Sequence, residues 1–276
     1  MTMTTETFDY IRELVHDKSA IIIDDSKQYL VDTRMEPLVR DSEFSGADEL
    51  VASLRSGRDR SLRDAIVNAM TTNETSFFRD HDVFDVLRDH VLPDLIEKRR
   101  HVRKLSFWCA AASSGQEPYS TLMLIRENFP ELIDWEIEFV ATDISTEMID
   151  RCRKGEYNQL EMSRGLPAPL LVKYFERAGT AWQIHPDLRE QVDFQIANLV
   201  EPLPTYVPRE PDIVFIRNVL IYFEVEIKRR ILEEVHTRLA PDGYMFLGGA
   251  ETTLNLHQGF DRVQFERGGC FVPKKD

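Results

Sequence analysis

Five continuous apolar runs constrain the fold of this chain more than any other feature of its sequence. They cover residues 105–111, 135–141, 192–197, 212–216 and 244–248. Several are separated by stretches with helical spacing, as at Ile227, Ile231 and Val235. Continuous apolar strands that alternate with helices are typical of a parallel sheet covered on both faces. We therefore predict an α/β fold with a mostly parallel sheet.

Two later segments depart from this alternation. Residues 262–266 and 270–274 are separated by two glycines and one arginine, which is typical of an antiparallel hairpin closing the sheet. Residues 155–191 are too many for a simple connection. Short strand patterns flank Ala178-Gly179-Thr180, and they predict a small inserted hairpin at about 173–194.

The first part of the chain shows helical patterns only. Phe8, Ile11 and Val15 keep helical spacing, and Leu62, Ile66 and Met70 form a similar stripe. Between them, Leu50, Val51 and Leu54 precede Gly57, a residue suited to ending a helix. We predict an all-helical N-terminal domain at residues 1–71 and a second domain at 72–276.

Charge and cysteine content exclude several classes of protein. The 276 residues carry a net charge of −14, which argues against binding to nucleic acid. The three cysteines are far apart and form no CxxC pair, so we expect a reducing compartment and no metal site. The N-terminus has no signal-peptide pattern, and no apolar run approaches the ~20 residues of a membrane helix. We expect a cytoplasmic monomer that does not insert into membranes.

The loop after the first predicted strand indicates a nucleoside ligand. It contains small residues, Ser113-Ser114-Gly115, and Glu117 follows. Ligands of open parallel sheets bind beyond the carboxyl ends of the strands. A dinucleotide site needs more glycines to hold a pyrophosphate, and the charge of Glu117 opposes a phosphate. The loop therefore suits a cationic ligand without phosphate, such as S-adenosylmethionine.

Two acidic residues near this loop each have two interpretations. Ser114 and Glu117 form an S-x-x-E pattern, which is also a helix capping box. Asp143 ends the second predicted strand, where a ribose-binding acid belongs, but it is also placed to cap a helix beginning near Ser145. Together, the two positions favour a nucleoside site.

A further polar pair interrupts the fourth predicted strand. Arg217 and Asn218 lie inside the apolar stretch "VFIRNVLIYF" (214–223). An arginine in a core strand costs several kcal/mol unless it reaches a partner or solvent. We therefore place Arg217 at the strand end, in the ligand crevice. Tyr222, in the same stretch, reads without further context as a core aromatic.

Four segments resemble the signature motifs of the chemotaxis receptor methyltransferases, the CheR family. They are "NETSFFRD" (73–80), "AAASSGQEPYS" (110–120), "ATDIS" (141–145) and "RNVLIYF" (217–223), in the family's order and at about its spacing. The combination is highly specific, although each motif alone is weak. The resemblance implies a Rossmann-like S-adenosylmethionine-dependent protein-glutamate O-methyltransferase. Its substrates would be glutamates on the cytoplasmic helices of chemoreceptors, its product S-adenosylhomocysteine, and its helical domain would dock the receptor.

The same resemblance assigns site residues. Arg79 and Tyr222 would be catalytic and stand nearest the transferred methyl, while Glu117 would meet the methionine amino group and Asp143 the ribose hydroxyls. The implied cofactor-binding residues are Asn73, Thr75, Arg79, Glu117, Asp143, Asn198, Leu199, Arg217 and Asn218. No metal is implied.

Two departures from the family pattern affect these expectations. The family often has a Gly-His-Ser-Glu-like turn where this chain has "GGAE" (248–251). The predicted hairpin is shorter than in members that grip a receptor's C-terminal pentapeptide, so we do not expect this chain to bind one. Because both partners are acidic, receptor docking requires a local basic cluster, for which Lys27 and Arg34 on one face of a predicted helix are candidates.

Other function classes remain open at the level of sequence. A nicotinamide-dependent oxidoreductase would share the fold class but lacks its phosphate loop here. A methyltransferase acting on small molecules would not explain the helical domain. A non-catalytic signalling module that binds S-adenosylmethionine would keep the fold and part of the site.

Overall fold

The computed structural model describes residues 3–57 and 60–275. The described chain divides into two compact units. One comprises Met1–Thr72 with Tyr222–Ile227, and the other comprises Asn73–Ile221 with Lys228–Asp276.

The first unit is built from helices, as the sequence patterns predict. Its elements are α1 (Thr5–Ser19), η1 (Asp25–Lys27), α2 (Gln28–Arg40), α3 (Ala47–Arg55) and α4 (Arg60–Met70). Ile11, Leu50, Leu54 and Ile66 are fully buried in its core. These residues belong to the stripes predicted from helical spacing, so burial of one face per helix accounts for this unit.

Arg34 has a structural role inside this unit. From α2, its guanidinium donates to the carbonyls of Met70 at 2.6 Å and Thr71 at 3.0 Å. It also donates to the hydroxyl of Thr72 at 3.1 Å. Arg34 therefore satisfies carbonyls at the end of α4. Lys27 lies in η1, before α2 begins, so the two residues do not share a helix as predicted.

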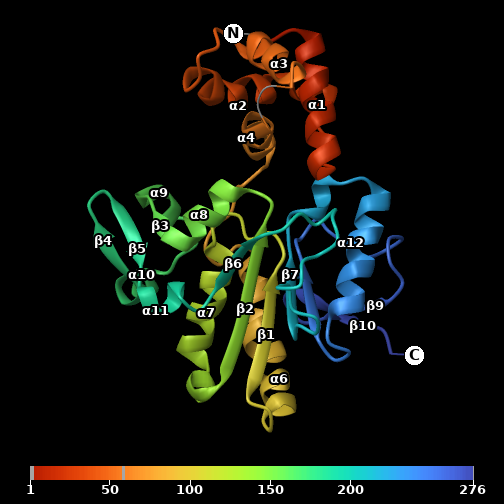
Figure 1. Ribbon diagram of the computed structural model, residues 1–276. Helices are drawn as coiled ribbons and strands as arrows, with labels where there is room; N and C mark the ends of the chain where they lie inside the picture. The colour runs from red at the N-terminus through yellow and green to blue at the C-terminus, as the bar shows by residue number, and fades with distance from the viewer. Residues whose placement is uncertain (1–2, 58–59, 276) are drawn as a thin grey trace. The chain divides into compact units, whose positions relative to one another are not determined.

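A seven-stranded sheet forms the centre of the second unit (Figure 1). Its strands are β1 (Lys104–Cys109), β2 (Glu136–Asp143), β6 (Asp193–Ile196), β7 (Ile213–Ile216), β8 (Tyr244–Leu247), β9 (Phe260–Gln264) and β10 (Gly269–Pro273). The order is β6-β2-β1-β7-β8-β10-β9. The first five strands in this order are parallel, and β10 is antiparallel to both of its neighbours. The predicted α/β class with a closing hairpin is confirmed, with β9 beginning two residues earlier than expected.

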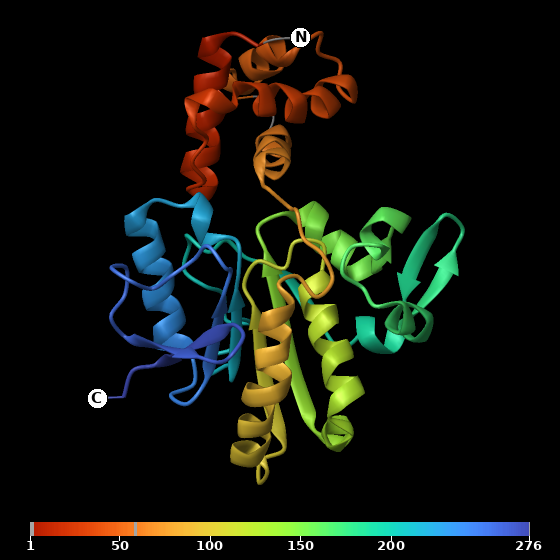
Figure 2. The ribbon, with the colours of Figure 1, turned by 180° about the vertical axis from the view of Figure 1, so that it is seen from behind.

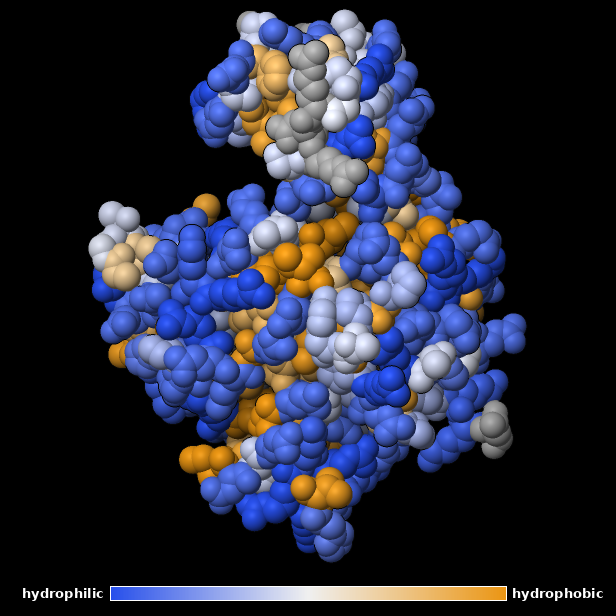
Figure 3. All heavy atoms as spheres, in the orientation of Figure 1, coloured by the Kyte–Doolittle hydropathy of each residue, from blue (hydrophilic) through white to orange (hydrophobic). Residues whose placement is uncertain are grey.

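Helices cover this sheet and bury its apolar strands. The longer ones are α5 (His81–Val86), α6 (Leu92–Arg99), α7 (Gln116–Asn128), α8 (Thr146–Lys154) and α12 (Val225–Arg238), with the π-turn η2 (Leu87–Val91) and short η3 (Pro130–Asp134) and η4 (Leu220–Tyr222). Figure 2 shows α6 and α7 in front of β1 and β2. Phe107 stacks on Phe139, and Phe215 on Phe246, with ring centroids 5.1 and 5.3 Å apart. The surface in Figure 3 is mostly hydrophilic, with apolar residues gathered in a band near the centre of the view and others scattered singly.

A small subdomain is inserted between β2 and β6. It contains β3 (Glu156–Tyr157), α9 (Gln159–Met162), α10 (Ala168–Tyr174), β4 (Phe175–Ala178), β5 (Ala181–Ile184) and α11 (Pro186–Arg189). β4 and β5 form the predicted hairpin, joined by Gly179 and Thr180. The structure adds β3, which pairs with β5 through two residues, Glu156 and Tyr157. A strand of that length leaves no detectable alternation in a sequence.

None of the helices in the described ranges combines the length and apolarity needed to cross a membrane.

Candidate functional site

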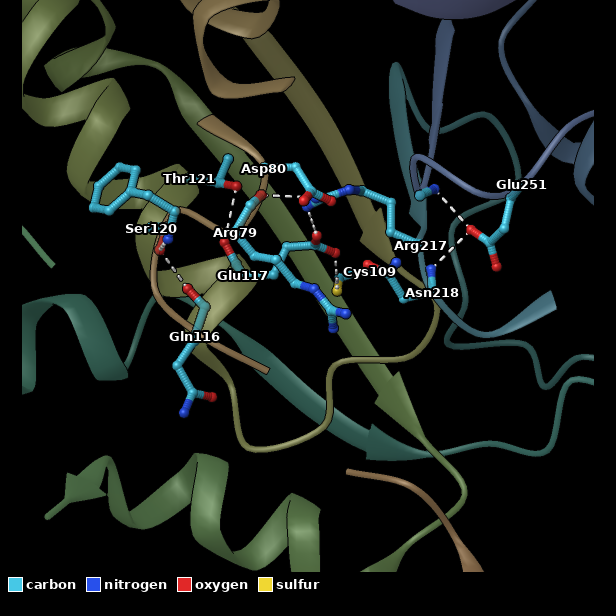
Figure 4. Close-up of polar contacts among 12 residues, drawn as sticks. Arg79, Asp80, Cys109, Gln116, Glu117, Ser120, Thr121, Arg217, Asn218 and Glu251 are labelled. Atoms are coloured by element: carbon cyan, nitrogen blue, oxygen red, sulfur yellow. Dashed lines mark hydrogen bonds and ion pairs between the residues drawn. The ribbon is translucent and has the colours of Figure 1, made fainter. Parts of the chain in front are cut away.

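The candidate site lies where β1, β2 and β7 end. These three strands are adjacent and parallel, so their carboxyl ends meet at one edge of the sheet. The loop after β1, Asp143 at the end of β2, and Arg217 directly after β7 are thereby brought together. Figure 4 shows the polar contacts at this edge.

The loop between β1 and α7 requires a glycine at its last position. Gly115 has φ of +92°, and a Cβ there would lie 3.2 Å from side-chain atoms of Cys152, Tyr119 and Tyr157. The loop backbone is anchored as well, because the Tyr157 hydroxyl donates to the Ser114 carbonyl at 2.8 Å. A larger residue at position 115 would therefore deform the backbone that a ligand approaches.

The capping-box interpretation of Ser114 and Glu117 is wrong. Gly115, which makes no side-chain cap bond, is the N-cap of α7, and the Ser114 hydroxyl donates to Gln116 at 2.8 Å. Glu117 instead forms an ion pair with Arg217 and accepts from the Cys109 thiol at 3.2 Å. Burial, followed by the Glu117 charge, raises the pKa of Cys109 well above its usual value. The thiol is thus kept protonated as a donor.

Arg217 is the charged centre of the site. Its side chain is 2% exposed and donates to Asp80 at 2.8 Å and to the carbonyl of Arg79 at 2.7 Å, in addition to Glu117. Burial alone would lower the pKa of Arg217, but the carboxylates of Glu117 and Asp80 outweigh it and raise the pKa. The Nε atom is buried and has no hydrogen-bond partner among the described residues. The prediction that Arg217 sits at a strand end with partners is thereby met, and one donor remains for a ligand.

Asp80 is a site residue that the sequence reasoning missed. It directly follows Arg79 in the first motif, and its carboxylate is about half exposed beside the buried guanidinium. The available signal was the physical requirement itself, since a buried arginine needs carboxylate partners. The sequence does not show which of the 48 acidic residues supplies them.

Asp143 joins two loop backbones. It is 7% exposed and accepts from the N–H of Ser113 at 2.8 Å and of Ser145 at 2.9 Å. Burial raises the pKa of Asp143, and the N–H groups of Ser145 and Ser113 partly offset that rise. The helix-cap interpretation is wrong, because Ser145 caps α8 by accepting from the N–H of Met148.

The segment before α5 is tied to the β1 loop. The Ser113 hydroxyl donates to the Asn73 carbonyl at 2.7 Å, and the Phe78 N–H donates to Ser120 on α7 at 3.0 Å. Arg79 donates to the carbonyl of Glu74 at 2.9 Å. These bonds close the loop 73–80, which also contains the half-buried Thr75. They bring Asn73 and Arg79 to the same edge as Glu117 and Asp143.

Of the remaining predicted site residues, Asn198 and Leu199 lie at the same sheet edge, whereas Tyr222 belongs to the helical unit. Asn198 and Leu199 follow β6 and are half-buried, and the Asn198 amide donates to Glu201 at 3.2 Å. β6 pairs with β2, so both residues belong to the same sheet edge. Tyr222 is the last residue of η4 and is half-buried. It is grouped with the helical unit, where its carbonyl accepts from Ile22 at 3.1 Å. Its catalytic role stays a prediction.

Backbone strain also concentrates here. Seven non-glycine residues in the described ranges have positive φ. Four of them lie in the motif segments: Phe78, Asp80, Ser113 and Asn218, at 50°, 58°, 49° and 57°. Such conformations cost about 1–3 kcal/mol each and cluster at ligand and active sites.

These groups fit S-adenosylmethionine. The buried Nε of Arg217 offers a hydrogen bond to a carboxylate, while Glu117 and Asp143 offer acceptors for an amino group and a ribose diol. The same acids disfavour a pyrophosphate. A carboxylate has about four acceptor positions, so Glu117, with Arg217 and Cys109 as partners, retains capacity for a ligand.

Comparisons with known proteins agree with this chemistry. The family model "CheR methyltransferase, SAM binding domain" matches residues 73–268, and "CheR methyltransferase, all-alpha domain" matches residues 6–71. Chemotaxis protein methyltransferase 1 of Pseudomonas aeruginosa is 40% identical over 99% of this chain and 100% of its own length. Chemotaxis protein methyltransferase Cher2 of Pseudomonas putida is 38% identical over 97% of this chain and 98% of its own. Chemotaxis protein methyltransferase 1 of Vibrio cholerae is 37% identical over 97% of each chain.

Proposed function

This chain belongs to the CheR methyltransferase family, and from that premise we propose that it methylates glutamate side chains on the cytoplasmic helices of chemoreceptors. It is an S-adenosylmethionine-dependent methyltransferase of chemotaxis. The observation that carries the finer proposal is that the likeness extends over both parts of the chain, residues 6–71 and 73–268. A methyltransferase acting on a small molecule has no need of the helical part.

The proposed reaction asks little acid–base chemistry of the protein. A glutamate side chain, with a pKa near ~4.3, is already ionised at neutral pH and needs no general base. Bound S-adenosylmethionine would supply a methyl group on a positively charged sulfur: the substrate carboxylate oxygen would form a bond to the methyl carbon as the carbon–sulfur bond breaks, and S-adenosylhomocysteine would leave as a neutral thioether. The chain's own residues then have to bind, align and exclude water.

We assign three binding roles within the second unit. Asp143 would accept from ribose hydroxyls, Glu117 from the amino group, and Arg217 would donate through Nε to the carboxylate of the cofactor. Support comes from the burial of Asp143 and Arg217, from the low exposure of Glu117, and from the unpartnered Nε. Asn73, Thr75, Arg79, Asn198, Leu199 and Asn218 would complete the site.

The helical unit would dock the receptor in the cytoplasm. Lys27 is exposed on η1 and suits contact with an acidic helix. Arg34 is a poor choice for testing this role, because its bonds to Met70 and Thr71 support the fold.

Methyl transfer to a receptor fragment tests the proposal directly. The protein should transfer radiolabel from S-adenosylmethionine to the cytoplasmic domain of a chemoreceptor, and mild base should release the label because esters are base-labile. A receptor whose methylation-site glutamates are all glutamine is the matched control and should stay unlabelled. Tight cofactor binding without transfer would instead favour a non-catalytic signalling module.

We expect no tight binding to a receptor's C-terminal pentapeptide. Only two residues, Gly179 and Thr180, join β4 to β5, and each strand has four residues. Such a short edge offers few main-chain partners for an added strand. Calorimetric titration of the peptide should show no binding at micromolar concentration, and a micromolar Kd would contradict the expectation.

Arg79 and Tyr222 should affect different kinetic constants. Methyl transfer cancels the charges of sulfonium and carboxylate, so an arginine near the carboxylate stabilises the ground state at least as much as the transition state. Arg79→Ala should therefore raise the KM for the receptor or for S-adenosylmethionine, and steady-state kinetics with each substrate varied in turn measures it.

Tyr222→Phe removes only a hydroxyl group. If that hydroxyl aligns the methyl donor or the acceptor oxygen, single-turnover rates should fall about ten- to a hundredfold, which corresponds to roughly 1.4–2.8 kcal/mol.

Cofactor affinity is the control for Tyr222→Phe. Tyr222→Phe should bind S-adenosylhomocysteine like the wild type. A wild-type turnover rate would show that Tyr222 is a structural aromatic and not a catalytic residue.

A further inference from the structure

One carboxylate accepts hydrogen bonds from four backbone N–H groups beside the site. The residue is Glu251, in the turn after β8 (Figure 4). Its Oε1 accepts from Val219 at 2.9 Å and Leu220 at 2.7 Å. Its Oε2 accepts from Asn218 at 2.8 Å and from Gly248 at 2.7 Å. Three consecutive amides of the segment that follows Arg217 therefore converge on one side chain.

This segment has no regular structure of its own. β7 ends at Ile216, and the short helix η4 begins at Leu220. Between them, Asn218 adopts φ of +57°, a left-handed conformation that costs energy for a residue with a side chain, although less for asparagine than for most others. Because N–H groups bonded to a charged acceptor are held more strongly than those bonded to a neutral one, the Glu251 carboxylate offsets this cost.

The turn that carries Glu251 is shaped for the contact. Its first residue, Gly248, accepts from the Glu251 N–H at 2.9 Å. A Cβ at position 248 would lie 2.6 Å from the side-chain Nδ2 of Asn218 and 2.8 Å from Glu251 Oε2. By contrast, Gly249 and Ala250 are exposed, and a Cβ at 249 would meet nothing within 4 Å. The contacts of this turn with residues 218–220 therefore come from Gly248 and Glu251, and residues 249 and 250 can be substituted without disturbing them.

We propose that Glu251 is a positioning residue of the methyltransferase site. It fixes the backbone of residues 218–220 and thereby sets the directions in which Arg217 and Asn218 project. Arg217 then reaches Glu117, Asp80 and the Arg79 carbonyl with one geometry. The inference rests on the cofactor-binding role proposed for Arg217 and Asn218, and Glu251 itself need not touch the cofactor.

Glu251→Gln is the sharpest variant because it preserves size. Each carboxylate oxygen accepts from two N–H groups. A glutamine retains one oxygen, and its NH₂ would face two donors in either orientation. The variant therefore loses two of the four hydrogen bonds, and its NH₂ group faces two backbone N–H donors that then have no acceptor. Ala250→Ser, in the exposed middle of the same turn, is the matched control.

Three measurements separate positioning from general stability. In the cofactor-free protein, hydrogen–deuterium exchange of the peptide covering 217–221 should speed up about tenfold or more in Glu251→Gln, with β1 and α7 unchanged. The Kd for S-adenosylhomocysteine should rise about ten- to a hundredfold. KM for S-adenosylmethionine should rise with it, while KM for the receptor stays the same. Ala250→Ser should match the wild type in all three.

A wild-type Kd in folded Glu251→Gln would overturn the proposal, as would faster exchange spread over the whole unit. If that variant does not fold, Gly248→Ala decides, since its Cβ displaces the same contact from the other side. Weaker S-adenosylhomocysteine binding in Gly248→Ala supports the role only together with faster exchange of the 217–221 peptide, because the Cβ also lies close to the Asn218 side chain. An unchanged Kd or unchanged exchange refutes it. Neither the exchange nor the binding measurement requires receptor methylation, so failure of the proposed substrate leaves this result interpretable.

Discussion

Replacing Arg217 with methionine should lower the unfolding free energy by about 3–5 kcal/mol, because breaking a buried ion pair leaves an uncompensated charge. Glu117 is only 13% exposed and would keep the Cys109 thiol as its remaining side-chain donor. Asp80, about half exposed, would be rehydrated. Cofactor affinity should fall as well, since the Nε donor is lost. Chemical denaturation and calorimetric titration of S-adenosylhomocysteine measure the two effects.

Two further variants identify which contact is responsible. Asp80→Asn should cost no more than about 1 kcal/mol, as expected for a partly exposed pair. The double variant Arg217→Met with Glu117→Gln removes both buried charges, and it should be more stable than Arg217→Met alone. With the single variant Glu117→Gln measured as well, the departure of the double variant from the sum of the two single variants gives the coupling energy between the two positions.

The same double variant tests whether the unpaired charge is the cause of the lost stability. If Arg217→Met with Glu117→Gln is as unstable as Arg217→Met, the loss reflects a cavity or lost packing against Phe84, whose ring centroid lies 6.0 Å from the guanidinium carbon. The site would then depend on Arg217 for shape more than for charge.

The sequence predicts the sheet well because most of its strands appear as short, mostly apolar runs. The run 105–111 contains one polar residue, Ser106, and the run 135–141 is interrupted only by Glu136 and Glu138, near the less buried start of β2. Such runs are mostly apolar because parallel strands are buried on both faces. The helical unit was equally readable, because each helix buries one stripe and the stripes have a fixed period. Element order and sheet class follow from these two periods.

The contacts that shape the site have no such local signature. Arg217 meets Asp80 and Glu117, which are 137 and 100 residues away in sequence. Glu251 holds amides more than 30 residues distant. The positive φ values of Ser113 and Asn218 accompany contacts of the same long-range kind, from Ser113 to Asp143 and from Asn218 to Glu251. The capping-box pattern at Ser114 and Glu117 was misleading for the same reason, because Glu117 pairs with Arg217 and not with a nearby backbone N–H.

Gly165→Ala should cost about 2–4 kcal/mol of unfolding free energy and weaken cofactor binding, although Gly165 is exposed and is not itself one of the proposed cofactor-binding residues. Gly165 has φ of +84°, and a Cβ there would lie 2.0 Å from the carbonyl oxygen of Phe77. That peptide cannot move aside easily. The Phe77 ring is fully buried against Tyr157 and Phe175, and the next N–H, from Phe78, is bonded to Ser120.

Gly179→Ala separates strain from collision. Gly179 also has positive φ, at +62°, but a Cβ there meets nothing within 4 Å. It should therefore cost only the backbone term, about 1–2 kcal/mol, and leave the Kd for S-adenosylhomocysteine unchanged. The additional loss of unfolding free energy in Gly165→Ala, relative to Gly179→Ala, then measures the cost of the collision with loop 73–80. That loop carries Asn73, Thr75 and Arg79. If Gly165→Ala loses stability but binds S-adenosylhomocysteine like Gly179→Ala, that loop does not need its observed position to bind the cofactor, and the binding roles proposed for these three residues would have to be withdrawn.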